Sequence, residues 1–224
     1  MTIGIFTAME KEARSFLANG EYVKANDGAF AVYKFKLAGH DAVLCCPPSV
    51  GEIAASAACQ LLITKYHVDV ILNFGVVGAL TEQTSLMSTV LVSSVVHYDM
   101  DTSVIDNLPV GRYGCFDDVV VECDKRLVDI ALSVEKLPCV RCASADKFVA
   151  APEQKAALNT NFGAEICDME SAGVLFTCKF NNVPCLLVKC ISDSLFGGTN
   201  EYRQNSVNAA AGFMTLAGAI CAKI

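Results

Sequence analysis

Short apolar runs alternate along the chain with longer stretches in which apolar residues recur every three or four positions. The runs predict strands at residues 2–7, 31–37, 42–46, 68–74, 89–96, 140–144 and 185–191. The longer stretches predict helices at residues 8–17, 51–66, 125–135, 152–160, 169–180 and 202–223. Several strands are apolar at consecutive positions, which indicates that both faces are covered. The order of elements therefore predicts an α/β layered fold around a mostly parallel or mixed sheet.

The chain shows no internal boundary. It has no Pro- or Ser-rich linker and no block of charge, so residues 1–224 are predicted to form one domain. The uncharged stretch at residues 204–222 contains several polar and small residues, so we expect a buried C-terminal helix there and no membrane span. Residues 99–118 lack periodicity and predict a long surface loop, a feature that is often functional.

Charge and cysteine usage exclude several classes of protein. Lys and Arg total 17 against 24 Asp and Glu, and a net charge of −7 argues against nucleic acid as a partner. The 12 cysteines are scattered through apolar stretches, which indicates reduced core residues of a cytoplasmic protein. The apolar start of the chain meets charged residues too soon for a signal peptide. The single CxxC, from Cys139 to Cys142, has no second pair at metal spacing, so no metal is predicted.

Carboxylates follow three of the apolar segments. In open α/β sheets, ligands bind at such positions, just beyond the ends of the strands. Glu12 opens a helix and either complements the helix dipole or is a general base kept ionised by the helix N-terminus. Asp168 and Glu170 either cap and flank a helix or accept hydrogen bonds from a vicinal diol such as ribose. Asp193 follows a very apolar strand, so it is either a turn residue or a general acid whose protonated form desolvation favours.

Other chemistries have little support in this sequence. The segment 73–79 predicts a strand that runs into a Gly-rich turn, which is either structural or a backbone wall for a flat ligand. It has neither the Walker loop nor the three-glycine dinucleotide pattern. The three histidines have no metal or triad spacing, and no Gly-x-Ser-x-Gly elbow is present. The residues therefore predict an acid-only site built from Glu12, Glu170 and Asp193.

The spaced motifs resemble those of the 5'-methylthioadenosine/S-adenosylhomocysteine nucleosidases, within the nucleoside phosphorylase superfamily. The matching segments occur in the family's order over nearly the whole chain, at residues 3–5, 8–12, 49–55, 73–78, 98–101, 146–149, 169–170 and 191–193. The resemblance implies a three-layer αβα fold with a central mixed sheet. It also implies a homodimer that hydrolyses the N-glycosidic bond of a 5'-substituted adenosine and releases adenine, with no cofactor and no metal.

The resemblance also implies roles for individual residues. Glu12 matches the general base for the attacking water, Asp193 the general acid at purine N7, and Glu170 the acceptor of the ribose hydroxyls. Positions that resemble the family's other substrate contacts are the purine clamp Phe148 and Val149, the purine wall Val77 and Gly78, Met169 under the sugar, and Met9, Val50, Lys189 and Ser192.

Four positions depart from the family pattern. Val76 stands where Ser is common, Lys189 where Arg is found, Asp168 where Glu is found, and Glu52 where Lys is usual. Loss of a hydroxyl and of a planar guanidinium changes the surroundings of the water and the ribose. Two alternatives therefore stay open: a phosphate-dependent purine nucleoside phosphorylase, although only Arg14 lies near a motif, and a non-catalytic nucleoside-binding protein.

Overall fold

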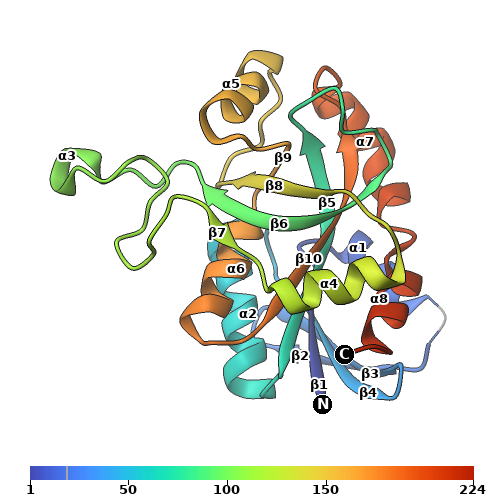
Figure 1. The fold of residues 1–224 in the computed structure, drawn as a ribbon. Helices are drawn as coiled ribbons and strands as arrows, with labels where there is room; N and C mark the ends of the chain where they lie inside the picture. The colour runs from blue at the N-terminus through green and yellow to red at the C-terminus, as the bar shows by residue number, and fades with distance from the viewer. Residues whose placement is uncertain (19) are drawn as a thin grey trace.

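The computed structural model describes residues 1–18 and 20–224 (Figure 1). Its strands are β1 Thr2–Phe6, β2 Val23–Asp27, β3 Phe30–Leu37, β4 His40–Cys46, β5 Val70–Ala79, β6 Thr89–His97, β7 Val121–Glu122, β8 Cys139–Ser144, β9 Ile166–Asp168 and β10 Cys185–Asp193. Its helices are α1 Glu10–Leu17, α2 Glu52–Tyr66, α3 Ser103–Asp106, α4 Lys125–Val134, α5 Pro152–Phe162, α6 Ser171–Phe180, α7 Gly198–Ala209 and α8 Phe213–Cys221.

The strands form one mixed sheet. The order is β10-β6-β8-β9-β5-β1-β4-β3-β2, with β7 paired to β6. Because β10 also pairs with β5, the strands β5, β10, β6, β8 and β9 close into a ring, from which β1, β4, β3 and β2 extend. Parallel pairs such as β1–β5 and antiparallel pairs such as β5–β9 both occur. The predicted central mixed sheet is confirmed.

Helices cover the sheet on two sides, as the consecutive apolar positions predict. One buried cluster joins α2 and α6 to the sheet, and a second joins α1, α4, α7 and α8 to the other face. Successive residues of a strand serve opposite clusters: in β10, Leu187 packs with the first and Leu186 and Val188 with the second. Figure 1 shows these helix groups on either side of the strands. The layered αβα architecture is thus confirmed.

The structure corrects several predicted boundaries. Strand β5 continues through the expected Gly-rich turn to Ala79, because β9 and β10 pair with this stretch. The single C-terminal helix predicted at residues 202–223 is two helices, α7 and α8. The break at residues 210–212 allows Phe213 to pack on Phe74, with ring centroids 5.4 Å apart. Strand β2 escaped prediction because it is short, mostly exposed and has only two apolar residues.

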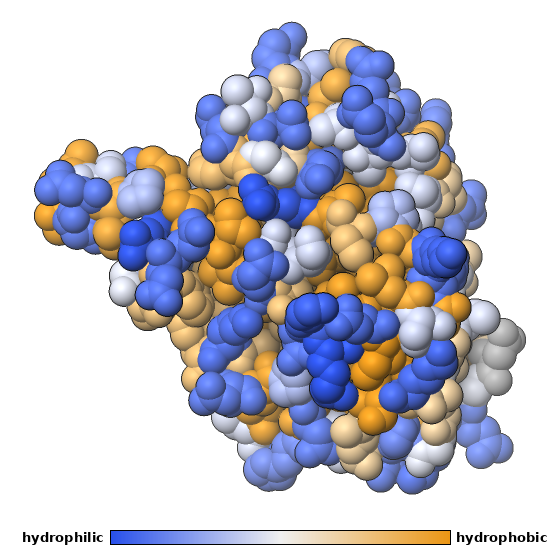
Figure 2. Space-filling model, viewed as in Figure 1, coloured by the Kyte–Doolittle hydropathy of each residue, from blue (hydrophilic) through white to orange (hydrophobic). Residues whose placement is uncertain are grey.

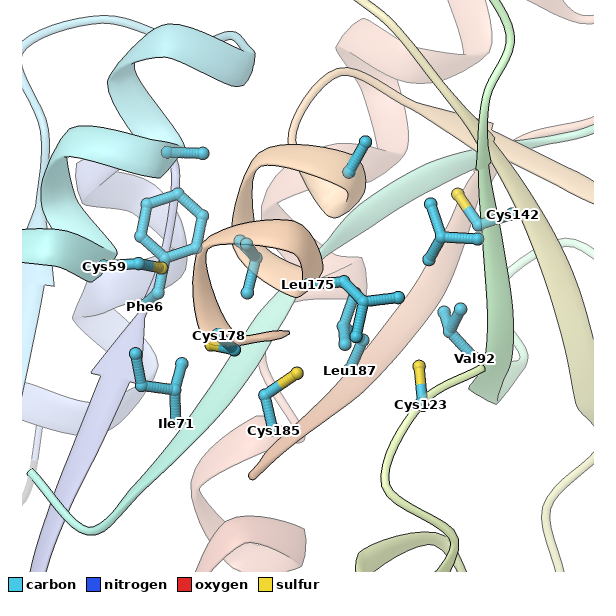
Figure 3. Close-up of a cluster of buried hydrophobic side chains, with 14 of the residues drawn as sticks. Phe6, Cys59, Ile71, Val92, Cys123, Cys142, Leu175, Cys178, Cys185 and Leu187 are labelled. Carbon is cyan, nitrogen blue, oxygen red and sulfur yellow. The ribbon is translucent and has the colours of Figure 1, made fainter. Parts of the chain in front are cut away.

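The cysteines are core residues in large part. Cys59, Cys178 and Cys185 lie in the apolar layer between α2, α6 and the sheet, together with Leu187 (Figure 3). None of the 12 cysteines is in a disulfide in the part of the chain that the structure describes. Among residues 1–18 and 20–224, no helix has both the length and the apolar character needed to cross a bilayer.

The loop predicted at residues 99–118 extends from the body of the molecule as an arm (Figure 1). Its tip carries the short helix α3, where Val104 and Ile105 are 95% and 82% exposed. At its base, His97 lies 2.7 Å from the Tyr113 hydroxyl through Nδ1 and 2.8 Å from Asp99 through Nε2. Figure 2 shows hydrophobic surface along this arm. An apolar surface held away from the core in this way is typical of an interaction site.

Candidate active site

A cavity of about 340 Å³ lies at the carboxyl ends of β1, β5, β9 and β10. This is the place where open α/β sheets bind ligands, and the volume is within the range of small-molecule sites. The residues proposed from sequence that line it are Met9, Glu12, Val50, Val77, Gly78, Phe148, Val149, Met169, Glu170, Ser192 and Asp193. The structure therefore brings together the three acids, from separate chain segments, on one cavity.

Glu12 is held by backbone donors from two elements. Its Oε2 accepts a hydrogen bond from Met9 N at 3.0 Å, and its Oε1 accepts one from Val76 N in β5 at 3.1 Å. The side chain is nearly fully buried, and this burial raises its pKa, although Lys189 and the two backbone donors act in the opposite direction. Desolvation is the larger effect on the pKa of this group, and the Met9 N–H at the helix N-terminus opposes it. A raised pKa suits a base that works near neutral pH.

Glu170 is fixed at the start of α6, where it is the N-cap residue. Its Oε1 accepts a hydrogen bond from Gly51 N at 3.0 Å. Gly51 has φ of 111°, a conformation that favours glycine, so this contact depends on the residue type at position 51. Burial, and then the nearby Asp168, raise the pKa of Glu170 to about 7. The carboxyl group can accept a second hydrogen bond from a ligand through its other oxygen.

Asp168 and Lys189 form a buried ion pair beside the cavity. Lys189 Nζ lies 2.8 Å from Asp168 Oδ2, and the side chains are 2% and 1% exposed. Burial by itself raises the pKa of Asp168, but Lys189 and hydroxyl donors outweigh it and lower the pKa. Burial likewise lowers the pKa of Lys189, and Asp168 reverses this effect. Lys189 was expected to contact substrate. In the structure its ammonium group binds Asp168, and Lys189 is not among the residues that line the cavity.

Asp193 is the last residue of β10 and is also paired with a lysine. Lys155 Nζ lies 2.6 Å from Asp193 Oδ2, and it donates a second hydrogen bond to Ser194 O at 2.7 Å. Both side chains are almost completely buried. The Ser192 hydroxyl donates to Asp193 Oδ1 at 2.9 Å. The buried Asp193 carboxyl group is therefore fixed by a lysine on one oxygen and a hydroxyl on the other.

The backbone at Gly78 makes room for Asp193. A Cβ atom at this position would lie 2.8 Å from Asp193 Oδ2 and 3.4 Å from Cys167 Sγ. Gly78 pairs with Asp193 across β5 and β10, at a point where the register shifts. Strand pairing and the missing side chain thus set the position of this carboxylate.

Two aromatic residues line the cavity, Phe148 and Tyr202. The rings of Phe148 and Tyr202 pack edge to face with centroids 5.3 Å apart. The Tyr202 hydroxyl lies 3.3 Å from Met9 Sδ and accepts a hydrogen bond from Lys11 Nζ at 3.3 Å. Aromatic and thioether groups provide apolar contact surface for a base or a sulfur-containing tail.

Four residues of the site were not predicted as site residues: Lys147, Cys167, Tyr202 and Lys155. The first three line the cavity, and Lys155 contacts Asp193. Tyr202 was predicted only as the first residue of the long C-terminal helix, and the short polar helix that carries it, α7, is seen only in the structure. Lys155 has no such signal, because α5 has little apolar periodicity and the burial of its lysine depends on β10.

Comparisons with known proteins agree with this arrangement. A profile for the phosphorylase superfamily matches residues 2–223. An aminodeoxyfutalosine nucleosidase of Campylobacter jejuni is 25% identical over 96% of each chain. A 5'-methylthioadenosine/S-adenosylhomocysteine nucleosidase of Maridesulfovibrio salexigens is 29% identical over 94% of each chain. The crystal structure of a Campylobacter jejuni nucleosidase of the latter name superposes over the full length of both chains, with a TM-score of 0.93 and 25% identity. This chain therefore belongs to the phosphorylase superfamily.

Proposed function

We propose that this protein is a purine nucleosidase that hydrolyses the N-glycosidic bond of a 5'-substituted adenosine and releases adenine. The observation that carries the proposal is the convergence of Glu12, Glu170 and Asp193 on one cavity. Cleavage of a ribosidic C–N bond passes through an oxocarbenium-like state, so it needs a placed water, a proton for the leaving group and an anchor for the sugar. The three acids supply these functions.

Glu12 is the general base in this mechanism. Each of its oxygens accepts one backbone hydrogen bond, so each keeps a lone pair that can bind the attacking water. Glu170 accepts hydrogen bonds from the ribose hydroxyls through the oxygen that Gly51 does not occupy. Two carboxyl groups with separate backbone anchors can thus hold the water and the sugar in a fixed relation.

Asp193 delivers a proton to the purine N7. The Lys155 ammonium, 2.6 Å from Asp193 Oδ2, is a source of that proton within hydrogen-bond distance. When the C–N bond breaks, N7 becomes more basic and takes the proton, and the attacking water loses its own proton to Glu12. After the product leaves, the Lys155–Asp193 pair regains a proton from solvent and Glu12 releases the proton that it took from the water.

Water fits the cavity better than phosphate as the nucleophile. Four acidic side chains line it, Glu12, Asp168, Glu170 and Asp193, against one basic side chain, Lys147. A phosphate dianion would need cations or free backbone donors near the sugar, and the Val76 amide beside Glu12 is already used by that carboxylate. This charge balance favours hydrolysis over phosphorolysis.

The 5' substituent lies against apolar surface in this proposal. Met9, Val50 and Phe148 line the cavity together with Tyr202, and a methylthio or homocysteinyl group can pack among them. 5'-methylthioadenosine and S-adenosylhomocysteine are therefore the first substrates to test. Aminodeoxyfutalosine is a second candidate, because the nucleosidase of that name from Campylobacter jejuni is similar over 96% of the chain.

The test is base release by the purified protein from these three nucleosides and from adenosine and inosine, each with and without inorganic phosphate. Release that does not depend on phosphate is expected, and its rates rank the 5' groups. Release that requires phosphate would make the protein a phosphorylase. Thermal stabilisation by nucleosides without any release would make it a binding protein.

We further propose that the whole chain works as one domain, as a homodimer in the cytoplasm. The exposed Val104 and Ile105 at the tip of the arm offer an apolar surface for a second copy. The unpaired cysteines are consistent with a reducing compartment. Light scattering of the wild type and of a Val104→Asp variant tests the dimer, because a charge at this interface should yield monomers.

A further inference from the structure

The Ser144 hydroxyl lies between two buried carboxyl groups beside the cavity. Its Oγ is 2.5 Å from Glu52 Oε1 and 2.6 Å from Asp168 Oδ1. The same oxygen accepts a hydrogen bond from Ala172 N at 3.2 Å. A hydroxyl has only one hydrogen to donate, so it can serve only one of the two carboxyl groups as donor.

The second short contact needs a hydrogen from a carboxyl group. Two ionised carboxylates would leave one oxygen facing the lone pairs of Ser144 Oγ in a buried site, which is costly. The donors around the cluster show which group is ionised. Asp168 accepts hydrogen bonds from Lys189 Nζ at 2.8 Å, from Ser171 Oγ at 2.5 Å and from Ser171 N at 3.1 Å. Glu52 has no cationic partner in the described residues. Apart from its contact with Ser144, it accepts only one hydrogen bond there, from Gly173 N.

We propose that Glu52 is a protonated positioning residue, whose carboxylic acid donates to Ser144 while Ser144 donates to the ionised Asp168. The bridge then runs from Glu52 Oε1–H through Ser144 Oγ–H to Asp168 Oδ1. The hydrogen of the Ser144 hydroxyl and both lone pairs of its oxygen are used, because Ala172 N donates to the second lone pair. Burial, and then Asp168, raise the pKa of Glu52 to about 8, which agrees with a neutral acid at pH 7.

The bridge fixes the residues that hold the sugar anchor. Glu52 is the first residue of α2, directly after Gly51, whose N–H donates to Glu170 Oε1. On the other side, Gly173 N in α6 donates to Glu52 Oε2. A Cβ on Gly173 would lie 2.8 Å from that oxygen, so the two helix ends meet too closely for another side chain. The carboxyl group of Glu52 thus joins the start of α2 to the start of α6. The position of Glu170, the N-cap residue of α6, depends on this contact.

Several ionisable groups face this cluster and will affect its titration. They are Asp146, which accepts from Glu52 N at 2.7 Å, Asp168 on β9, Glu170 at the start of α6, Lys189 on β10, and the tyrosines Tyr98 and Tyr113. Asp168 and Glu170 disfavour ionisation of Glu52 because they carry the same charge. The proton is therefore held by the surrounding charges as well as by burial.

Infrared spectroscopy of the full chain at pH 7 tests the proton directly. We expect the Glu52→Gln difference spectrum to show the loss of a protonated carboxylic acid band. The exposed Glu122→Gln variant is the matched control and should lose a carboxylate band instead. A carboxyl-carbon NMR titration of the wild type needs no variant and should find a buried glutamate with a midpoint near pH 8 that is absent from Glu52→Gln. Loss of a carboxylate band in Glu52→Gln would overturn the proposal.

Thermal unfolding gives an independent readout. The folded chain keeps a proton on Glu52 that the unfolded chain releases near the ordinary glutamate pKa, so stability should fall as pH rises from about 5 to 8. The glutamine variant lacks this proton, and its stability relative to wild type should increase over the same interval. Parallel pH profiles for the two proteins would count against the proposal.

The kinetic arm rests on the proposed function, whereas the spectroscopic and thermal arms do not need a substrate. Glu52→Ala should raise KM for the nucleoside roughly tenfold or more and change kcat less, because it removes the donor to Ser144 and leaves Gly173 N without its acceptor. Glu52→Gln should rescue most of this loss, since an amide donates to Ser144 and accepts from Gly173. Failure of the amide to rescue KM, with a folded variant, would refute the positioning role while leaving the nucleosidase proposal intact.

Discussion

Replacement of Lys189 by methionine would remove the buried positive charge that pairs with Asp168 beside the cavity. Lys189 Nζ is 2.8 Å from Asp168 Oδ2, and both side chains are at most 2% exposed. Methionine keeps much of the length and apolar volume of the lysine stem but removes the ammonium group. The variant would therefore leave Asp168 as a buried carboxylate without its cation.

The expected loss of stability is large. Removal of one partner of a buried ion pair costs about 3–5 kcal/mol. For a chain of 224 residues, about 2–4 °C in Tm per kcal/mol gives a fall of roughly 6–20 °C. The loss should be smaller at pH 5 than at pH 8, because Asp168 without Lys189 can take up a proton and become neutral. In the wild type, the lowered pKa of Asp168 maintains the ion pair down to more acidic pH.

The assay is thermal unfolding of Lys189→Met, Asp168→Asn and the double variant at pH 5 and pH 8. The double variant should be more stable than the sum of the single losses predicts, because neither charge is then left alone. Lys125→Met is the control: Lys125 and Asp129 are 2.9 Å apart, close to the 2.8 Å of the buried pair, but both are exposed, so their pairing is screened by water. Additive losses, or a Lys189→Met variant as stable as Lys125→Met, would refute the reasoning.

Three further predictions concern turnover. Asp193→Asn should lower kcat by about 10²–10⁴-fold with nucleoside binding largely kept, because an amide can bind N7 but cannot protonate it; wild-type turnover in single-turnover assays would exclude Asp193 as the acid. Glu12→Gln should lower kcat by a similar factor of about 10²–10⁴. In the wild type, the raised pKa of Glu12 should place the acidic limb of the kcat/KM profile above the ordinary glutamate range. A glutamine variant with lower Tm but unchanged kcat would mean that Glu12 has a structural role. Gly78→Ala should lower kcat more than Tm, since a Cβ there would lie 2.8 Å from Asp193 Oδ2; a crystal structure with Asp193 unmoved would contradict this.

Much of the site was visible in the sequence because ligands of this sheet type bind beyond the strand ends. Glu12, Glu170 and Asp193 each follow an apolar strand or open a helix, and local pattern is enough to find such positions. The layered fold was predictable for the same reason, since runs of consecutive apolar residues require helices on both faces. Residues with no local signal, such as Lys155, could not be found.

The pattern of the chain by itself determined the αβα layers, the candidate acids and the superfamily that the motifs resemble. Only the tertiary structure decided the partners of those acids, because a partner is set by contacts between distant segments. Lys155 pairs with Asp193 across 38 positions and Ser144 meets Glu52 across 92. Burial then changes the chemistry: it raises the pKa of Glu12 and Glu52 and makes a lysine beside Asp168 a structural cation. Desolvation depends on the whole fold, so local sequence cannot specify these protonation states.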